Sequence, residues 1–150
     1  MPRTLPVRDS APQRSAPPAM FACSLVNGDP DSACVHVAGE LDLATTPKLE
    51  VALRDALRLA RLVVLDLRDV AFIDSSGVFA IVNANDRARM LARRLVILRG
   101  PAHVDRIFTL TRTAEQLEFA QADSIGPLCT DASRHRRSIT LRNPPALRAL

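Results

Sequence analysis

The sequence predicts a single α/β domain, a mixed β-sheet with helices packed on it, in the order β-β-α-β-α-β-α-β. Three observations lead to this prediction. The chain has 150 residues, which suits one domain and is too short for two. It has no Trp or Tyr and only five Phe, so branched aliphatic residues and Ala must build the core. Aliphatic runs of strand length alternate with segments of helical periodicity.

The first half of the domain begins with a predicted hairpin. Residues 21–26 form an edge strand, the Asn-Gly-Asp-Pro segment 27–30 is a strong turn signal, and residues 33–38 alternate as the antiparallel partner. Thr46 is then predicted as the N-cap of a helix, with Pro47 at its first position. Apolar residues at helical spacing follow and define the buried face of this helix.

The second half alternates strands and helices. Residues 62–67 are the most apolar segment and are predicted as the central strand, after which a short loop reaches residues 72–73. The next helix extends to about Leu91, which we expect to face inward with the other apolar residues of that helix. The remaining predicted elements are a strand at 95–98, a helix that Pro101 opens, and a strand at 117–120.

The two ends of the chain differ from this domain in composition. Residues 1–20 are rich in Pro and are predicted to be a disordered arm, and residues 121–150 are predicted to be an Arg-rich, mostly disordered tail. Residues 138–141 allow a brief strand or none. The net charge of +4 lies in these ends, because residues 21–120 hold 12 basic and 13 acidic residues. A nearly neutral domain argues against a nucleic-acid partner.

Three cysteines, Cys23, Cys34 and Cys129, have no metal-binding spacing. Cys23 and Cys34 could face each other on adjacent strands, but an odd count in a chain without a secretory leader favours reduced thiols. No apolar run approaches the roughly 20 residues that cross a membrane. We therefore expect a cytoplasmic protein with no membrane partner, no metal and no cofactor.

The segment Asp74-Ser75-Ser76-Gly77 lies where a buried strand feeds a helix. A hydroxyl at a helix N-terminus can carry a phosphate, which the unpaired backbone N–H groups and the helix dipole would stabilise. The simpler reading is that Ser75 or Ser76 caps the helix, and local sequence alone favours that reading. Both readings remain open at this point.

An enzyme is the weakest hypothesis. A nucleophilic Ser needs a base within hydrogen-bond reach, and the three His residues lie on a predicted strand (His36), at a helix start (His103) and in the tail (His135). No nucleophile-elbow motif or phosphate-binding Gly loop is present. We therefore expect no catalytic residues and no enzymatic activity.

Three segments together resemble the STAS domain, and most closely its anti-sigma factor antagonist branch. They are Gly39-Glu40-Leu41-Asp42, the stretch Val63-Val64-Leu65-Asp66-Leu67 with Phe72-Ile73-Asp74-Ser75-Ser76-Gly77, and the later Leu95-Val96-Ile97-Leu98 with Pro101, Val104, Ile107 and Phe108. The resemblance covers about residues 21–120 and implies a STAS-like fold for them.

The resemblance implies a partner-switching function. Unphosphorylated members of this branch bind an anti-sigma factor that is a serine kinase of the GHKL ATPase type, which frees a sigma factor. Phosphorylation of the serine after the motif Asp ends the binding, and a serine phosphatase restores it. By position that serine is Ser75. The alternative is an accessory subunit of a transport system or a stress-sensing assembly.

The resemblance also implies roles for residues around Ser75. Asp42 and Asp74 would flank the hydroxyl, Ser76 would be its neighbour that is not a substrate, and Gly77 would let the partner approach the backbone. The expected partner contacts are Gly39, Glu40, Thr45 and Val78.

Overall fold

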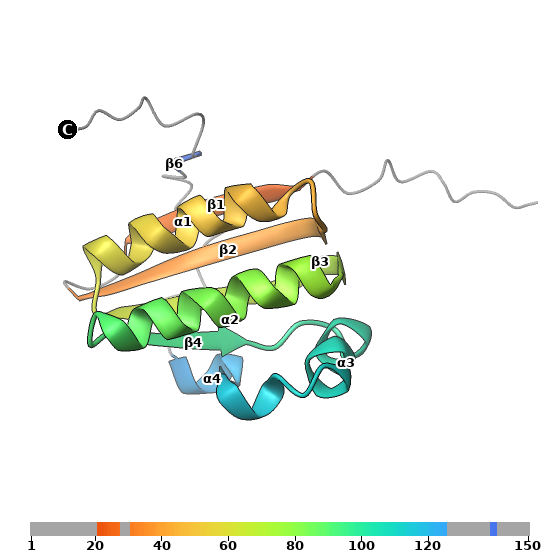
Figure 1. Cartoon of the computed structure of the whole chain (residues 1–150). Coiled ribbons are helices and arrows are strands. Elements are labelled where there is room, and N and C mark those ends of the chain that lie inside the picture. Colours follow the sequence, from red (N-terminus) through yellow and green to blue (C-terminus); the bar gives the residue numbers. More distant parts are fainter. Residues whose placement is uncertain (1–20, 28–30, 126–138, 141–150) are drawn as a thin grey trace, which may run out of the picture.

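The computed structural model describes residues 21–27, 31–125 and 139–140 as a layered α/β domain (Figure 1). One six-stranded mixed sheet has the order β5-β4-β3-β2-β1-β6. Strands β2 to β5 run parallel, and β1 is antiparallel to both of its neighbours. The strands are β1 (Ala22–Asn27), β2 (Ser32–Leu41), β3 (Leu62–Ile73), β4 (Arg94–Leu98), β5 (Glu118–Ala120) and β6 (Ile139–Thr140).

Two long helices, α1 (Thr46–Leu59) and α2 (Ser75–Met90), lie side by side across one face of the sheet (Figure 1). The shorter α3 (Ala102–Leu110) lies beyond the C-terminal end of β4, and the chain continues through the 3-10 helix η2 (Ala114–Gln116) to β5 and α4 (Ala122–Ile125). The first eight strands and α-helices follow the predicted order, which confirms the fold class. No helix among the described residues has the length and apolarity needed to span a bilayer.

The main core lies between the sheet and the two long helices. Val63, Leu65 and Leu67 of β3 are fully buried, as are Leu49 and Leu53 of α1. Since β3 is flanked by β2 and β4, the prediction of a central apolar strand is confirmed.

Strand β3 is longer than predicted. The expected loop after residue 67 is absent, and pairing with β2 continues until Leu41 lies opposite Ile73. The side chains of Arg68 and Asp69 are exposed, and the strands absorb the change of register as irregularities between His36 and Ala38 and between Gly39 and Glu40.

Two helix starts differ by one residue from the prediction, because α1 begins one residue earlier and α3 one residue later. The N-cap of α1 is Thr45, and that of α3 is Pro101. Thr46 already belongs to the first turn of α1, because its backbone N–H and its hydroxyl both donate to the carbonyl oxygen of Asp42, at 2.9 and 2.6 Å. At the other end of α2, Leu91 is 49% exposed, so its expected inward orientation is wrong.

The cysteines also differ from expectation. Cys23 lies opposite Val37 and Cys34 lies opposite Val26, so the two cysteines do not face each other. Cys23 is a free thiol, and burial raises its pKa to about 12. Cys34 is disulfide-bonded, which contradicts the expected reduced state at this position. The odd count suggested reduced thiols, but it leaves room for one pair; Cys129 lies outside the described residues.

Of the two readings of residues 138–141, the structure contains the strand. Ile139 and Thr140 pair with Leu25 and Ser24 of β1. Helix α4 begins the segment predicted as a tail, where no element was expected. The predicted arm at 1–20 and most of the tail lie outside the described residues, so their disorder stays a prediction.

One buried ion pair lies on β3. Asp66 is fully buried, and its carboxylate accepts two hydrogen bonds from the Arg68 guanidinium, at 2.9 and 2.8 Å. The Arg68 side chain is 38% exposed. Loss of the arginine would therefore leave a buried carboxylate without this partner, which is the costly way to break such a pair.

We expect Arg68→Ala to lower the free energy of unfolding by about 3 kcal/mol, measured by urea denaturation. Arg106→Ala is the control, because Arg106 is exposed and makes no ion pair within the described ranges; it should change stability by less than about 0.5 kcal/mol. Adding Asp66→Asn to Arg68→Ala should recover part of the loss. Equal stability of the two single variants would contradict this role of the pair.

Candidate functional site

The site lies at the end of the sheet where the parallel strands terminate. Because Leu41 lies opposite Ile73, β2 and β3 end together, and the backbone N–H of Asp74 donates to the Leu41 carbonyl oxygen at 3.1 Å. The loop after β2 and the turn after β3 are thus neighbours, at the right-hand end of Figure 1. This is the edge of an α/β sheet where functional groups gather.

Asp74 is the N-cap of α2. Its Oδ1 accepts hydrogen bonds from the backbone N–H groups of Ser76, at 2.9 Å, and Gly77, at 3.2 Å. The reading in which Ser75 or Ser76 caps this helix is therefore wrong. A carboxylate with extended backbone reaches the second and third N–H groups of the helix, and the serines lie inside the first turn.

Ser75 is the first helical residue, and its side chain is exposed, whereas Ser76 is half-buried. Within the described residues, the Ser75 hydroxyl makes no hydrogen bond. Ser75, the serine that the motif position predicts to be phosphorylated, therefore has the more accessible hydroxyl.

Asp42 organises the loop between β2 and α1. Its Oδ1 accepts from the backbone N–H groups of Ala44, at 3.0 Å, and Thr45, at 3.1 Å. The Thr45 hydroxyl donates to the carbonyl oxygen of Glu40 at 2.8 Å. The carboxylates of Asp42 and Asp74 each shape their own loop, and neither forms a hydrogen bond with Ser75.

The residues expected to contact a partner differ in their exposure to solvent. Glu40 is exposed and Thr45 is half-buried, so both are accessible at this end of the domain. Gly39 and Val78 are buried, and Val78 is only 1% exposed, so the expectation that they contact a partner is wrong. Gly39 instead has φ of 94° at an irregularity of the β2–β3 pairing, and Val78 packs in the core.

Gly77 also has a different role from the expected one. It is buried, and a Cβ at this position would lie 2.8 Å from Leu41 Cδ2 and 2.9 Å from Ile73 Cγ1. The missing side chain lets the start of α2 pack closely on the ends of β2 and β3, rather than giving a partner access to the backbone.

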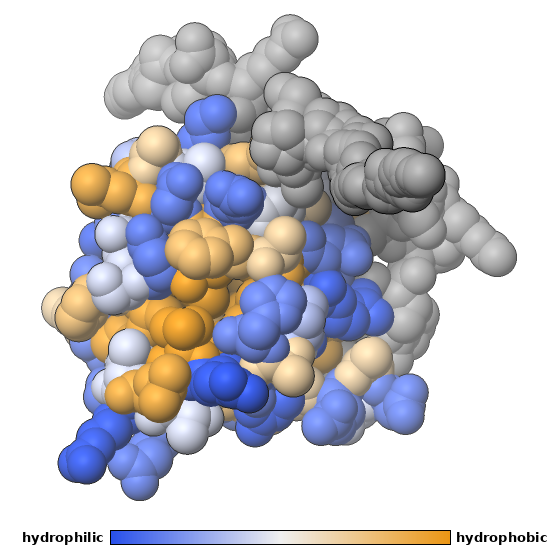
Figure 2. Space-filling view, turned by 90° about the vertical axis from the view of Figure 1, so that its right-hand side faces the viewer, coloured by the Kyte–Doolittle hydropathy of each residue, from blue (hydrophilic) through white to orange (hydrophobic). Residues whose placement is uncertain are grey.

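Sequence reasoning missed three exposed apolar residues of the elements that meet here. Leu43 is 75% exposed, Phe72 is 47% exposed and Phe79 is 63% exposed; we call these three residues the apolar rim. Figure 2, which views this end of the domain, shows hydrophobic surface near its middle with hydrophilic groups around it. Phe79 follows Ser75 by four residues, and this spacing puts both on one helix face.

The described histidines have partners away from the serine. The His103 ring nitrogen Nε2 donates to the Ala71 carbonyl oxygen at 2.6 Å, and His36 Nε2 lies 2.7 Å from Asp69 Oδ2. Neither forms a hydrogen bond with Ser75. In the described part of the chain, no group of three or more His, Cys, Asp or Glu side chains is arranged to hold a metal ion.

Comparison with known proteins identifies the family to which this domain belongs. The family model described as "Mlab, STAS domain" matches residues 24–118. The anti-sigma-B factor antagonist of Listeria monocytogenes is 30% identical over 97 residues, which cover 63% of this chain and 84% of that protein.

Solved structures share the fold. An anti-sigma factor antagonist from Mycobacterium paratuberculosis has a TM-score of 0.63 at 22% identity, covering 73% of this chain and 93% of that one. The anti-sigma factor antagonist SpoIIAA in its unphosphorylated form has a TM-score of 0.59 at 18% identity, covering 69% and 91%. The chain belongs to the STAS domain family, in its anti-sigma factor antagonist branch.

The packing at Gly77 generates a stability prediction. Alanine is favoured over glycine inside a helix by about 1 kcal/mol, but the added methyl group overpacks a tight contact at a cost of about 1–3 kcal/mol. We expect Gly77→Ala to lower the free energy of unfolding by about 1 kcal/mol in urea denaturation, the difference between these two effects. Ser76→Ala, one residue earlier, should change it by less than about 0.5 kcal/mol. A Gly77→Ala protein as stable as the parent would show that this contact relaxes freely.

Proposed function

We propose that this protein is an anti-sigma factor antagonist controlled at Ser75. Its unphosphorylated form binds an anti-sigma factor that is a GHKL-type serine kinase, and a sigma factor is thereby released in the cytoplasm. Phosphorylation of Ser75 ends the binding, and a serine phosphatase restores it. The observation that carries the proposal is the exposed Ser75 hydroxyl on a helix whose N-cap is already supplied by Asp74.

The cap determines how a phosphate at Ser75 would act. Asp74 already accepts hydrogen bonds from the Ser76 and Gly77 N–H groups, so these donors are not free to bind the phosphate as the sequence suggested. The phosphoryl group would stay at the surface and add about −1.5 to −2 charges beside the Asp74 carboxylate. The modification would therefore change the surface charge and leave the start of α2 intact.

The apolar rim supports a binding surface at this end. Exposed apolar side chains gain free energy when a partner covers them, and Phe79 lies one turn beyond Ser75 on α2. A phosphate within such an interface must lose its hydration, which is costly unless the partner pairs it with cationic groups. The same surface can thus bind a partner in one state and release it in the other.

The switch is tested by incubating the protein with the candidate anti-sigma kinases of the same genome and ATP, followed by mass spectrometry of the peptide that spans Ser75 and Ser76. We expect one phosphate, on Ser75. Ser75→Ala should bind the kinase whether or not ATP is present. Ser75→Asp should bind at least about tenfold more weakly, because it places a charge in the interface.

Ser76→Ala is the matched control and should be phosphorylated and released like the parent protein. Phosphate on Ser76, or parent-like binding by both Ser75 variants, would contradict the switch. Recovery of an ATP-binding cassette protein without any GHKL kinase would favour the accessory-subunit alternative.

The apolar rim gives a second prediction. We expect Phe79→Ala to weaken binding of the anti-sigma factor about tenfold or more, because a large aromatic residue in an interface often carries much of its binding energy. Met90→Ala is the control, since Met90 is 85% exposed at the other end of the same helix. Both variants should keep the parent's unfolding midpoint, and equal affinities for the two would rule out a contact at Phe79. Isothermal titration calorimetry measures the affinities.

A further inference from the structure

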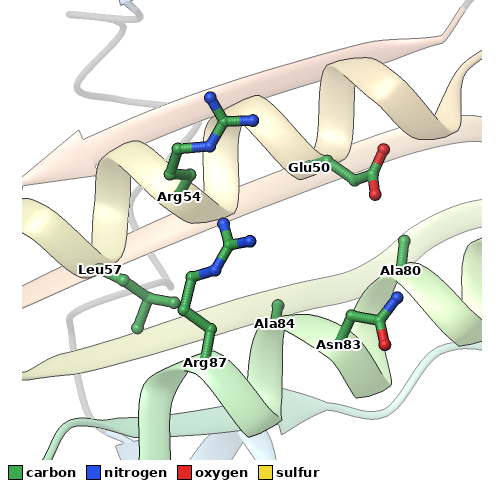
Figure 3. A pocket seen from close by; sticks show the side chains of 7 residues that line it. All are labelled: Glu50, Arg54, Leu57, Ala80, Asn83, Ala84 and Arg87. Carbon is green, nitrogen blue, oxygen red and sulfur yellow. The ribbon is translucent and has the colours of Figure 1, made fainter. Parts of the chain in front are cut away.

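The long helices enclose a groove that begins at Ala80, one residue after Phe79, and continues along α2 to Arg87. It has a volume of about 100 Å³, and Figure 3 shows its lining side chains. The hollow exists because α2 presents two small residues there, Ala80 and Ala84, one turn apart, and Leu57 of α1 is buried beneath. The lining residues are Glu50, Arg54, Leu57, Ala80, Asn83, Ala84 and Arg87.

Two arginines, one from each helix, line this groove. In Figure 3, Arg87 points from α2 toward α1, and the Arg54 guanidinium group lies over α1. Neither forms an ion pair or a hydrogen bond within the described part of the chain. By contrast, Arg94 pairs with Glu118, and Arg99 with Asp105.

Two cations that line one groove repel each other when no anion is near, and an anion bound in the groove would attract both. A guanidinium group is also suited to hold carboxylate or phosphate oxygens through paired N–H donors. The volume is a few times the roughly 30 Å³ share of one water molecule and well below the roughly 300–1,000 Å³ of a typical small-molecule pocket. The space therefore fits one anionic group and not a whole ligand.

We propose that the groove between α1 and α2 is an anion-binding site in which Arg54 and Arg87 together hold one carboxylate or phosphate group. The source is either an acidic side chain of a protein partner or free phosphate. The site does not depend on the function proposed for Ser75, because it uses other residues and another part of the surface.

Two more lining residues shape the site. Asn83 contributes an amide that can donate to a bound oxygen. Glu50 lies one turn before Arg54 on α1, and its carboxylate repels an anion in the groove. Removing that charge should therefore strengthen binding, which a loss of structure could not do.

The test uses the full-length ¹⁵N-labelled protein, titrated separately with sodium phosphate and sodium acetate at constant ionic strength maintained with sodium chloride. We expect saturable shifts of the Nε–H signals of Arg54 and Arg87. Arg54→Gln and Arg87→Gln should each weaken binding about tenfold, since each removes a charged donor pair. Glu50→Gln should tighten it about twofold or more.

Arg106→Gln is the matched control, because Arg106 on α3 is exposed and has no ion pair among the described residues, yet lies outside the groove. It should leave the affinity unchanged. Shifts that never saturate, or equal losses at Arg54, Arg87 and Arg106, would overturn the site and indicate screening of surface charge only.

A second measurement identifies the source of the anion. The Arg54→Gln/Arg87→Gln protein is compared with the parent for binding to the anti-sigma factor found through Ser75. Weaker binding with normal phosphorylation of Ser75 assigns the groove to a carboxylate of that partner, and unchanged binding with a saturable phosphate titration assigns it to free phosphate. Because the titration needs no partner, failure of the site and failure of the Ser75 switch are distinguishable.

Discussion

The arrangement of the functional end depends on the parallel pairing of β2 with β3 as far as Leu41 and Ile73. These residues lie 32 positions apart in the sequence, and the hydrogen bond from the Asp74 N–H to the Leu41 carbonyl oxygen ends the two strands together. Their side chains then form the surface on which α2 begins. Gly77 is the residue that must be small there, because any Cβ would overlap with both. Strand register, helix position and serine exposure are thus consequences of one pairing.

The two aspartates at this end mainly stabilise the backbone. Asp42 closes the β2–α1 loop and Asp74 caps α2, each through an Oδ1 that accepts two backbone N–H groups. Side-chain caps of this kind stabilise a helix by about 1 kcal/mol. Because the two carboxylates accept the hydrogen bonds of the backbone N–H groups in the loop and at the helix start, Ser75 is not needed as a cap at the first helical position. A group without a structural role can be modified without unfolding its surroundings, which suits a reversible switch.

The sequence predicted what depends on local periodicity. The order of elements, the central position of residues 62–67 and the serine turn after that strand all follow from apolar spacing and turn residues. Burial at the motif was not predictable in the same way, because it depends on how separate elements pack. Val78 belongs to the motif's first turn yet lies in the core, whereas Phe79, the next residue, is exposed. The exposure of Phe79 could have been predicted from its spacing, because Phe79 follows Ser75 by four residues and residues four apart share a helix face.

Helix α2 connects the two surfaces that this chain offers. Ser75 and Phe79 lie at its beginning, at the end of the domain that also holds Asp42 and Asp74. Arg87 lies twelve residues after Ser75, which is about 18 Å along a helix axis. A partner surface of ordinary size, with roughly 800 Å² per side, extends over such a distance. One partner can therefore contact the apolar rim and reach the arginine groove at the same time. Where the groove holds a carboxylate of that partner, phosphate at Ser75 would act on the first contact only, and release would require that the loss at the apolar rim outweighs the contact that the groove retains.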